Sequence, residues 1–514
     1  MVESNNQRLA KNTLLLYIRT FLVLFLSLYI TRLVLQALGE RDLGIYNVVG
    51  GIVVMLSFVQ SSLTITIGRF ITFELGRDPS SDNMSKICSI CITILMIAGL
   101  IIFVISEFAG VYIIEEWTTI PQERMLAAHV VYQFSLLIFL VQMQRVPFDS
   151  IVIAHEKMSF YAYMSIFETI LKLLAVVLLL KTRSDRLIAY VGLLFLITII
   201  LFCCYYYYVK KYYNHCRLHW MWDRKVSYSI MMFSGWSVLG SATNTATQQG
   251  VNLLLNNFVG LVANTAMGFT NQVVQAVNVF VSSFTTAFNP QVTKYYAAGE
   301  QQNLQLLMCR ASKFSFVLAF FIACPMIINM DYLLSIWLKD VPQYTTDFCR
   351  LVLVCAIIDA TTGVYNTAIT ASGKIKKYQI CISISFLIDL IISYFLLING
   401  IYPAFVFVSR IITRGFLNMG VGLYFSYREV SFNLQDYFRQ VLQPIILILL
   451  FMAPFAWGCE MLESGVLKLL ITSLLIFVSV PFLTYFLFLT SAERLVLKSY
   501  MQTTVFHFKK NIKV

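Results

Sequence analysis

"VPFDSIVIAHEKMSFYA" (146–162) aligns without a gap with "GVYNTAITASGKIKKYQ" (363–379), which lies 217 residues further along the same chain. Both stretches carry alanine and lysine at matching positions, as Ala-x-Glu-Lys at 154–157 and Ala-x-Gly-Lys at 371–374. A match at a fixed spacing indicates an internal repeat, and in membrane transporters such repeats can define the fold.

Three weaker matches follow the same order at nearly the same spacing. They align Gly39 with Gly260, "SSLTITIGRF" (61–70) with "SSFTTAFNPQ" (282–291), and Trp117 ahead of a proline with Trp337 ahead of a proline. Six predicted helices separate equivalent positions, and because six is even, both halves share one orientation. The repeat therefore predicts two lobes related by an axis near the membrane normal, with a cavity between them.

The composition is that of a membrane protein. The chain has 514 residues, of which 59% are hydrophobic and 12% are charged, whereas soluble proteins carry roughly 25% charged residues. Apolar runs of about 20 residues recur along the whole length, and each can cross the hydrocarbon core of a bilayer. Strict alternation of apolar and polar residues is missing, which argues against an outer-membrane barrel. We predict an all-α, polytopic membrane protein.

Hydropathy and turn residues place fourteen spans on the sequence. These are residues 14–36, 44–67, 87–107, 125–146, 160–180, 187–208, 227–255, 264–288, 312–335, 348–370, 378–398, 402–426, 441–459 and 466–489. They divide the chain into an N-terminal lobe (1–220, helices 1–6), a C-terminal lobe (221–430, helices 7–12) and residues 431–514, with two extra helices and a basic tail. The connections are too short for a separate soluble domain.

The charge distribution predicts the orientation. With both termini in the cytoplasm, most of the 38 Lys and Arg residues fall on that side, chiefly in segment 209–226 and in the tail, as the positive-inside rule requires. The net charge of +12 then reflects topology and attraction to anionic lipids, and nothing indicates nucleic acid. The eleven cysteines follow no metal-ligand or disulfide spacing, so we expect buried thiols and no metal site.

Several ionisable side chains lie inside predicted spans, where they are costly and therefore candidates for function. The acidic ones are Glu168, Asp359 and Asp389. Glu168 and Lys172 stand four residues apart and can pair on one helix face. Two interpretations stay open for these groups: internal ion pairs that fix helix packing, or binding of a coupling ion such as H⁺ or Na⁺.

Arg410 and Arg414, also four residues apart, share one face of the predicted span 402–426. We favour a role in a cavity for this pair, because a guanidinium suits bidentate recognition of phosphate. Lys172 is a further cavity candidate. Arg19 lies inside the first span, where snorkelling to the interface and anion binding explain it equally well.

Amide side chains are concentrated in the predicted spans 227–255 and 264–288. They are Asn244, Gln248, Asn252 and Asn256 in and just after the first, and Asn271, Gln275 and Asn278 in the second. A face of uncharged donors and acceptors suits loose binding of a hydroxyl-rich cargo. Hydrogen bonds between helices are the alternative.

These residues resemble a known family. The chain is similar to bacterial polysaccharide repeat-unit flippases of the Wzx type, in the multidrug/oligosaccharidyl-lipid/polysaccharide (MOP) exporter superfamily. The similarity covers essentially the whole chain. It is most specific in "NTLLLYIRTFLVLFLSLYITRLVLQALGERDLGIYNVVGG" (12–51) and "RFITFELGRD" (69–78), and the paired elements at 154–157 and 371–374 support it.

The resemblance implies a MATE-like fold of two six-helix bundles facing a cavity, plus two further helices. It implies transport of undecaprenyl-diphosphate-linked oligosaccharide, such as an O-antigen, capsular or exopolysaccharide repeat unit, from the cytoplasmic to the periplasmic leaflet of the inner membrane by alternating access. Arg19 becomes a candidate diphosphate contact. No cofactor is implied, and the expected partners are the lipid-linked cargo, membrane lipids and the polysaccharide polymerase and chain-length machinery.

Two other classes compete with this interpretation. Another MOP transporter, either a peptidoglycan lipid-precursor flippase or a multidrug antiporter, shares most features, although antiporters typically have twelve helices. A polytopic glycosyltransferase needs acidic residues in its first external loop, and Glu40 and Asp42 superficially provide them. That fold usually brings long external loops or a soluble domain, which are not found here, so we do not predict an enzyme.

The stretch "LQALGERDLGIYNVVGG" (35–51) resembles a phosphate-binding loop only in its glycines, because it matches no nucleotide-binding pattern and follows a helix. We expect Gly39 and Gly44 to end one helix and begin the next. Gly50 and Gly51 would allow close approach of another helix. Glu40, Arg41 and Asp42 are then expected to be solvated charges in a turn.

Overall fold

The structure is a computed structural model that describes residues 5–77, 83–117, 120–182, 185–213, 223–338, 340–463, 465–489 and 494. The predicted basic tail (Lys498, Lys509, Lys510 and Lys513) and Arg217 of the basic connection lie outside these residues. Throughout the described residues the chain forms helices and turns and contains no strand. The predicted all-α class is therefore confirmed.

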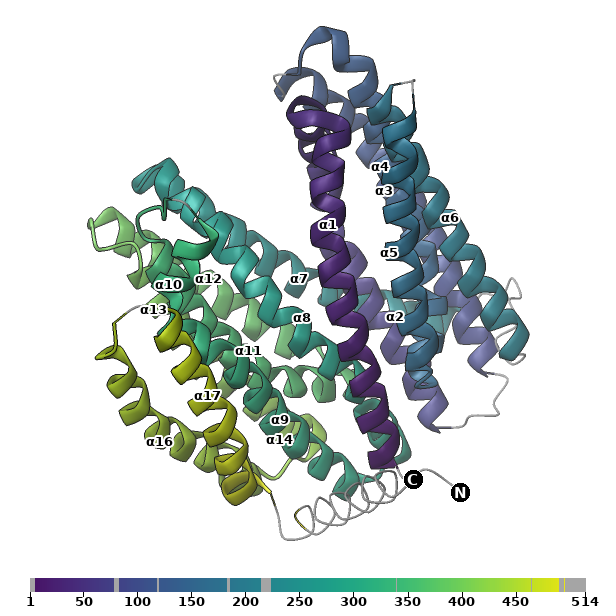
Figure 1. Ribbon diagram of the computed structural model, residues 1–514. Helices are drawn as coiled ribbons and strands as arrows, with labels where there is room; N and C mark the ends of the chain where they lie inside the picture. Colours follow the sequence, from purple (N-terminus) through teal and green to yellow (C-terminus); the bar gives the residue numbers. More distant parts are fainter. Residues whose placement is uncertain are drawn as a thin grey trace, which may run out of the picture. The chain divides into compact units, whose positions relative to one another are not determined.

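The residues that the structure describes form seventeen α-helices, which follow one another along the chain (Figure 1). The first six are α1 (Asn5–Val54), α2 (Ser57–Arg77), α3 (Asn83–Trp117), α4 (Met125–Ala154), α5 (Met158–Lys181) and α6 (Arg186–Tyr212). The next six are α7 (Arg224–Phe258), α8 (Leu261–Ala298), α9 (Gln301–Ile328), α10 (Met330–Trp337), α11 (Thr345–Ser372) and α12 (Lys376–Ile398). The last are α13 (Phe405–Ile412), α14 (Met419–Val430), α15 (Leu434–Tyr437), α16 (Gln443–Glu460) and α17 (Val466–Leu483).

Ten stretches of described helix are long and apolar enough to cross a membrane. Each overlaps one of the predicted spans, although the predicted span 312–335 runs past the end of α9 at Ile328 into α10. The other four predicted spans, 44–67, 227–255, 264–288 and 402–426, are helical over most of their length but are not among the ten, and 44–67 is divided by the turn between α1 and α2. Three of these four carry the amide side chains of α7 and α8 or the pair Arg410 and Arg414, whereas the other ionisable residues predicted inside spans lie in helices that are among the ten.

The chain forms two compact units, each built from separate stretches of sequence. The first unit comprises residues 1–249, 282–304 and 367–387, and the second comprises 250–281, 305–366 and 388–514. Helices α7, α8, α9, α11 and α12 each contribute one end to each unit. The predicted boundaries at 220 and 430 describe the sequence repeat and stay a prediction.

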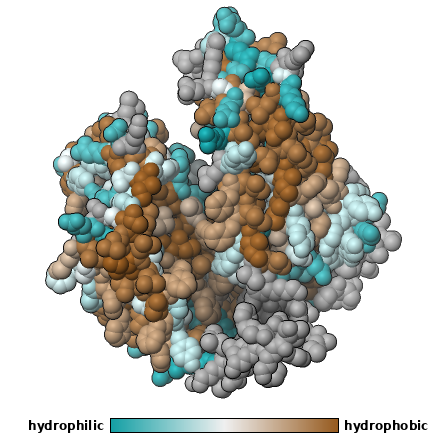
Figure 2. Space-filling model, in the orientation of Figure 1, coloured by the Kyte–Doolittle hydropathy of each residue, from teal (hydrophilic) through white to brown (hydrophobic). Residues whose placement is uncertain are grey.

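Large apolar side chains are exposed along the helices of both units. Phe25, Leu100 and Leu474 are 71%, 65% and 65% exposed. Figure 2 shows such side chains along the helix flanks and hydrophilic side chains near the helix ends. Exposed apolar surface on this scale is expected where lipid replaces water as the solvent.

The repeat appears in the backbone as pairs of left-handed residues. Gly39 (φ 77°) and Gly260 (φ 100°) occupy matching positions, and so do Glu156 (φ 58°) and Gly373 (φ 77°). A positive φ is favourable mainly for glycine, so each of these two aligned pairs shares an uncommon backbone feature at the same position of its turn.

Gly39 breaks α1 into two helical segments, with φ 77° and ψ 172°, as its predicted role as a helix stop requires. The second segment resumes directly afterwards, so Gly44 is inside a helix and does not begin one. The prediction for Gly50 and Gly51 is wrong, because a Cβ atom added at either residue would meet nothing within 4 Å. Among the described residues, no other helix therefore packs against these two positions.

Ion pairs hold the break at Gly39 in place. Arg124, just before α4, pairs with both Asp42 and Asp185, and Arg186 donates to the Ala37 carbonyl at 3.1 Å. Asp185 also caps α6 by accepting from the backbone amides of residues 187 and 188, a common arrangement at helix N-termini. Asp42 is therefore an ion-pair partner and not a freely solvated charge. The side chains of Glu40 and Arg41 are not among those that the structure describes.

Candidate functional site

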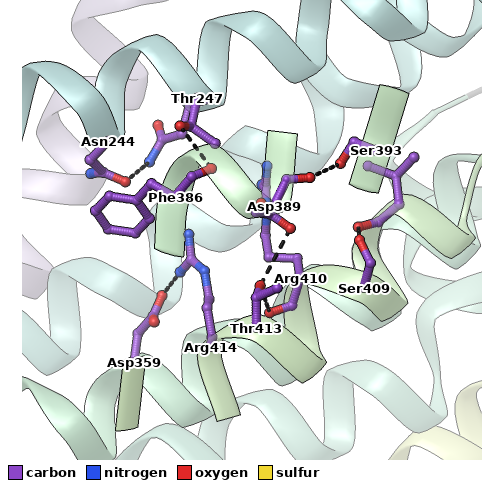
Figure 3. A network of polar contacts seen from close by, with 12 residues as sticks. Asn244, Thr247, Asp359, Phe386, Asp389, Ser393, Ser409, Arg410, Thr413 and Arg414 are labelled. Carbon is purple, nitrogen blue, oxygen red and sulfur yellow. Dashed lines mark hydrogen bonds and ion pairs between the residues drawn. The ribbon is translucent and has the colours of Figure 1, made fainter. Parts of the chain in front are cut away.

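A buried ion pair joins α12 to α13 in the second unit. Arg410 Nε donates to Asp389 Oδ2 at 3.1 Å, and the two side chains are only 7% and 6% exposed. The Thr413 hydroxyl donates to the other oxygen of Asp389 at 3.4 Å, and the Arg410 guanidinium lies 5.6 Å from the centre of the Phe407 ring. Figure 3 shows Asp389 with Arg410 and Thr413.

A second pair, between Arg414 and Asp359, joins α13–α14 to α11 (Figure 3). Asp359 is 46% exposed and Arg414 is 16% exposed. Arg414 lies in a π-helical turn, Thr413–Asn418, that connects α13 to α14, and such turns are frequent at functional sites. The turn begins between the two arginines, which pair with acids on different helices.

The structure thus brings together residues that the sequence assigned to separate roles. Arg410 and Arg414 were predicted to bind cargo, and Asp359 and Asp389 to couple an ion. Each arginine instead has one of these aspartates as its partner, so binding of a phosphate would require the arginine to exchange its carboxylate for it. Arg410 Nη2 is buried without a hydrogen bond to any described residue.

A comparable network joins α4 and α5 in the first unit. Lys172 Nζ and Glu168 Oε1 are 2.7 Å apart, as their spacing predicts. Arg145 pairs with Asp149 at 3.1 Å and lies 4.0 Å from Glu168. Sequence reasoning missed Arg145 and Asp149, although their spacing of four residues on a helix that continues to Ala154 could have indicated the pair.

Arg19 on α1 differs from these cations, because it forms no ion pair with a described carboxylate. Its guanidinium lies 5.3 Å from the centre of the Tyr161 ring, which is a cation–π contact. Its Nε is buried and has no hydrogen-bond partner among the described residues. Among the predicted cavity cations it is the one that has no ion pair with a carboxylate of the described residues.

The predicted amide residues divide between the two units. In the first unit, Gln248 donates to Asn244 at 3.4 Å, and the nearby Thr247 hydroxyl donates to the Phe386 carbonyl at 3.3 Å (Figure 3). In the second unit, Asn252 is half-buried, whereas Asn271 and Gln275 on α8 are exposed. Asn278 continues the exposed row one turn further.

The second unit also contains an apolar cavity of about 480 Å³. Helices α9, α11, α14 and α16 line it, with side chains that include Phe316, Phe320, Ile358, Leu449 and Met452. Its volume falls within the usual range of small-molecule sites. The sequence did not indicate it, because the lining comes from four separate helices.

Comparison with known proteins identifies the fold. Residues 237–395 match the MatE family, and no curated protein matches the chain. A solved multidrug-resistance MATE transporter of the MOP superfamily, in an outward-facing conformation, is similar with a TM-score of 0.71, at 10% identity over 84% of this chain and 96% of that one. A MATE structure in a bent conformation gives a TM-score of 0.70, at 13% identity over 84% and 96% of the two chains.

A third solved structure is a MOP superfamily transporter from Pyrococcus furiosus, described by the reversed polarity of its binding pocket. It has a TM-score of 0.68, at 12% identity over 84% of this chain and 99% of that one. Identities this low establish the fold and leave the substrate open. The chain therefore contains a segment that matches the MatE family, and it has the fold of the MATE transporters of the MOP superfamily.

Proposed function

We propose that this chain is a flippase that moves a polyprenyl-diphosphate-linked oligosaccharide from the cytoplasmic to the periplasmic leaflet of the bacterial inner membrane. The observation that carries the proposal is the state of Arg19, which lies inside a membrane-spanning helix and has no described carboxylate partner. A cation left unneutralised within a bilayer is costly. A guanidinium kept in this state suits a ligand that brings its own negative charge, such as a diphosphate.

Two further features match the other parts of such a cargo. Asn271, Gln275 and Asn278 are exposed on α8 at spacings that place them on one helix face. Amides exposed to lipid would lose their hydrogen bonds, so we expect this face to contact water or sugar hydroxyls. The apolar cavity of about 480 Å³ offers a separate environment for part of an isoprenoid chain.

The proposal includes an orientation and a source of energy. Both termini lie in the cytoplasm, and the polysaccharide polymerase and chain-length proteins are the expected partners. Glu168, Asp359 and Asp389 are the candidates for coupling to H⁺ or Na⁺. Each is already paired with a cation, so a coupling ion would compete with Lys172, Arg414 or Arg410 for the carboxylate.

Another MOP transporter remains the closest alternative. A peptidoglycan-precursor flippase or a multidrug antiporter would have the same fold, and the comparisons fit them equally well. The polytopic glycosyltransferase draws no support from the comparisons, and one of its two candidate acids, Asp42, is bound to Arg124.

Deletion of the gene, followed by mass spectrometry of lipid-linked intermediates, tests the proposal. We expect a complete repeat unit to accumulate on the cytoplasmic side and to be exported again when the gene is restored. Accumulation of the peptidoglycan precursor or a gain in drug sensitivity would instead identify the alternative transporters. A truncated sugar would indicate a transferase, and an unchanged lipid pool would contradict the proposal.

A further inference from the structure

In the first unit, one end of α8 holds the turn between α4 and α5. Lys294 Nζ lies 2.7 Å from Glu156 Oε1, and Gln291 Nε2 donates to Glu156 Oε2 at 3.4 Å. Asn12 on α1 donates to the Glu156 carbonyl at 3.4 Å. Glu156 has a φ of 58°, which is unfavourable for a residue with a side chain, so these contacts hold the turn in a strained conformation.

One end of α2 holds the equivalent turn between α11 and α12. Arg69 donates through Nε and Nη2 to the Ala371 carbonyl at 3.3 and 3.1 Å. Its guanidinium also lies over the rings of Phe70 and Phe73, 4.6 and 4.5 Å from their centres. Gly373 makes room for it, because a Cβ there would lie 2.8 Å from Arg69 Nη2.

The two sets of contacts are reciprocal under the repeat. Helix α2 belongs to the first half of the repeat and holds the turn of the second half, whereas α8 belongs to the second half and holds the turn of the first. The two helices touch at Gly76, where a Cβ would lie 2.7 Å from Lys294 Cα and 3.1 Å from Ala297 Cβ. Positions 76 and 297 are 221 residues apart, which is the offset that aligns 61–70 with 282–291. A position that contacts its own equivalent lies on the axis of a two-fold arrangement.

Further contacts continue along the same face of α8. Ala287 packs with Leu16 and Met158 in a buried apolar cluster, and the Ser283 and Thr20 hydroxyls are hydrogen-bonded at 2.7 Å. Lys294, Gln291, Ala287 and Ser283 are spaced by three or four residues and therefore form one row. At 1.5 Å per residue this row is roughly 16 Å long.

The hydroxyl contact also has an equivalent on α2. The Ser62 hydroxyl lies 3.3 Å from the Ser237 carbonyl on α7 and 2.8 Å from the Phe58 carbonyl of its own helix. Ser62 and Ser283 are 221 residues apart. In each half of the repeat, one helix therefore presents a hydroxyl and a charged side chain that contact the other half. Within the first unit, two equivalent rows of contacts, one along α8 and one along α2, therefore join the two halves of the repeat.

We propose that these two rows form a two-sided gate. Arg69 on α2 holds the turn between α11 and α12, and Gln291 and Lys294 on α8 hold the turn between α4 and α5. We call each of these two sets of contacts a lock. The gate rests on the orientation in the proposed function, which places both turns on the cytoplasmic side. The two rows separate to admit cargo from the cytoplasm, and they come together again when cargo is released outward. The two locks differ in chemistry: Lys294 binds a carboxylate, whereas Arg69 binds a backbone carbonyl. Neutralising Glu156 therefore weakens the first lock and leaves the second intact.

Thiol accessibility tests the gate without reference to the cargo. Ser283 is replaced by cysteine, and its labelling by a membrane-impermeant maleimide is measured in inverted vesicles, above the background of the unsubstituted chain. We expect slow labelling in the parent and faster labelling in Glu156→Gln and in Arg69→Gln. The combined variant should label about tenfold faster or more, because each lock is a hydrogen bond to a charged group. Right-side-out vesicles should show no comparable increase.

The charge-exchanged variant Glu156→Lys/Lys294→Glu restores an ion pair and should return labelling towards the parent rate, which a variant that merely misfolds would not do. Asp331→Asn breaks a pair of the same length, 2.7 Å to Arg350 in the second unit, and serves as the matched control. Unchanged labelling in the combined variant would overturn the gate, whatever the cargo proves to be. Altered labelling with a normal lipid pool would instead support the gate and reject the flippase.

Discussion

Arg410 and Asp389 form an ion pair that is almost completely buried in the second unit, with Nε and Oδ2 at 3.1 Å. Two charges withdrawn from solvent stabilise a fold only when they neutralise one another, and removal of one leaves the other uncompensated. Neither residue can therefore bind a cargo or an ion unless its partner in the pair is replaced.

Asp389→Asn should destabilise the protein strongly, by about 3–5 kcal/mol, because it leaves Arg410 charged and buried. Asp389→Leu combined with Arg410→Leu removes both charges and should unfold at nearly the parent temperature. Thermal unfolding of the purified protein in detergent measures both effects. If Asp389 also couples an ion, the double variant will be stable and yet inactive in export. A single variant as stable as the parent would show that the pair does not form.

Arg414→Ala should impair export of the repeat unit while protein levels stay normal. Its partner Asp359 is 46% exposed, so the remaining carboxylate can be solvated, and the stability loss should be small. Export is measured by complementation of the deletion strain. Arg350→Ala, which removes the more exposed pair with Asp331, is the control. Near-normal export by Arg414→Ala would remove Arg414 from the site.

Glu168→Gln should change the dependence of transport on the proton or sodium gradient. Glu168 lies 2.7 Å from Lys172 and 4.0 Å from Arg145. Loss of its charge therefore removes the ion-pair partner of Lys172, whereas Arg145 keeps its pair with Asp149. Transport into vesicles with an imposed gradient of either ion measures the effect. Asp149→Asn removes the neighbouring carboxylate and shows whether any change is specific. If gradient dependence persists unchanged, Glu168 serves only to pack α4 against α5.

Arg19→Gln should reduce export by about tenfold or more, since a charge-assisted hydrogen bond to a phosphate contributes on that scale. Arg19→Lys keeps the charge but loses the planar group that lies over Tyr161, and we expect only partial export. The amount of accumulated lipid-linked cargo provides the readout. Equal export by both variants and the parent would mean that Arg19 is structural and that the flippase loses its main support.

Gly39→Ala should destabilise the protein by about 1–2 kcal/mol, because alanine tolerates a left-handed conformation poorly. Gly50→Ala should be neutral or slightly stabilising, because Gly50 is helical with open space around its Cβ position and alanine favours helix. The two unfolding temperatures can be compared directly. A loss of stability in Gly50→Ala would indicate that another helix does pack closely against Gly50, contrary to the structure.

The order of helices was predictable from residues alone. Apolar runs mark membrane spans because each run must bury its own length in lipid, whatever surrounds it. The repeat was equally visible, and it correctly aligned Gly39 with Gly260 and residue 156 with Gly373 in backbone conformation. Pairing within a helix, as for Glu168 and Lys172, could also be predicted, because helical geometry determines which neighbours meet.

Partners on different helices could not be predicted in this way. Asp389 meets Arg410, Asp359 meets Arg414 and Arg124 meets Asp42 because of how each helix is rotated and which helix lies beside it. Hydropathy along one segment carries no information on either. The sequence by itself thus determined that the chain crosses the membrane repeatedly and is built from two equivalent halves. Only the tertiary structure decided which buried charges are neutralised, because a charge separated by many residues becomes a partner only when packing brings it within hydrogen-bond distance.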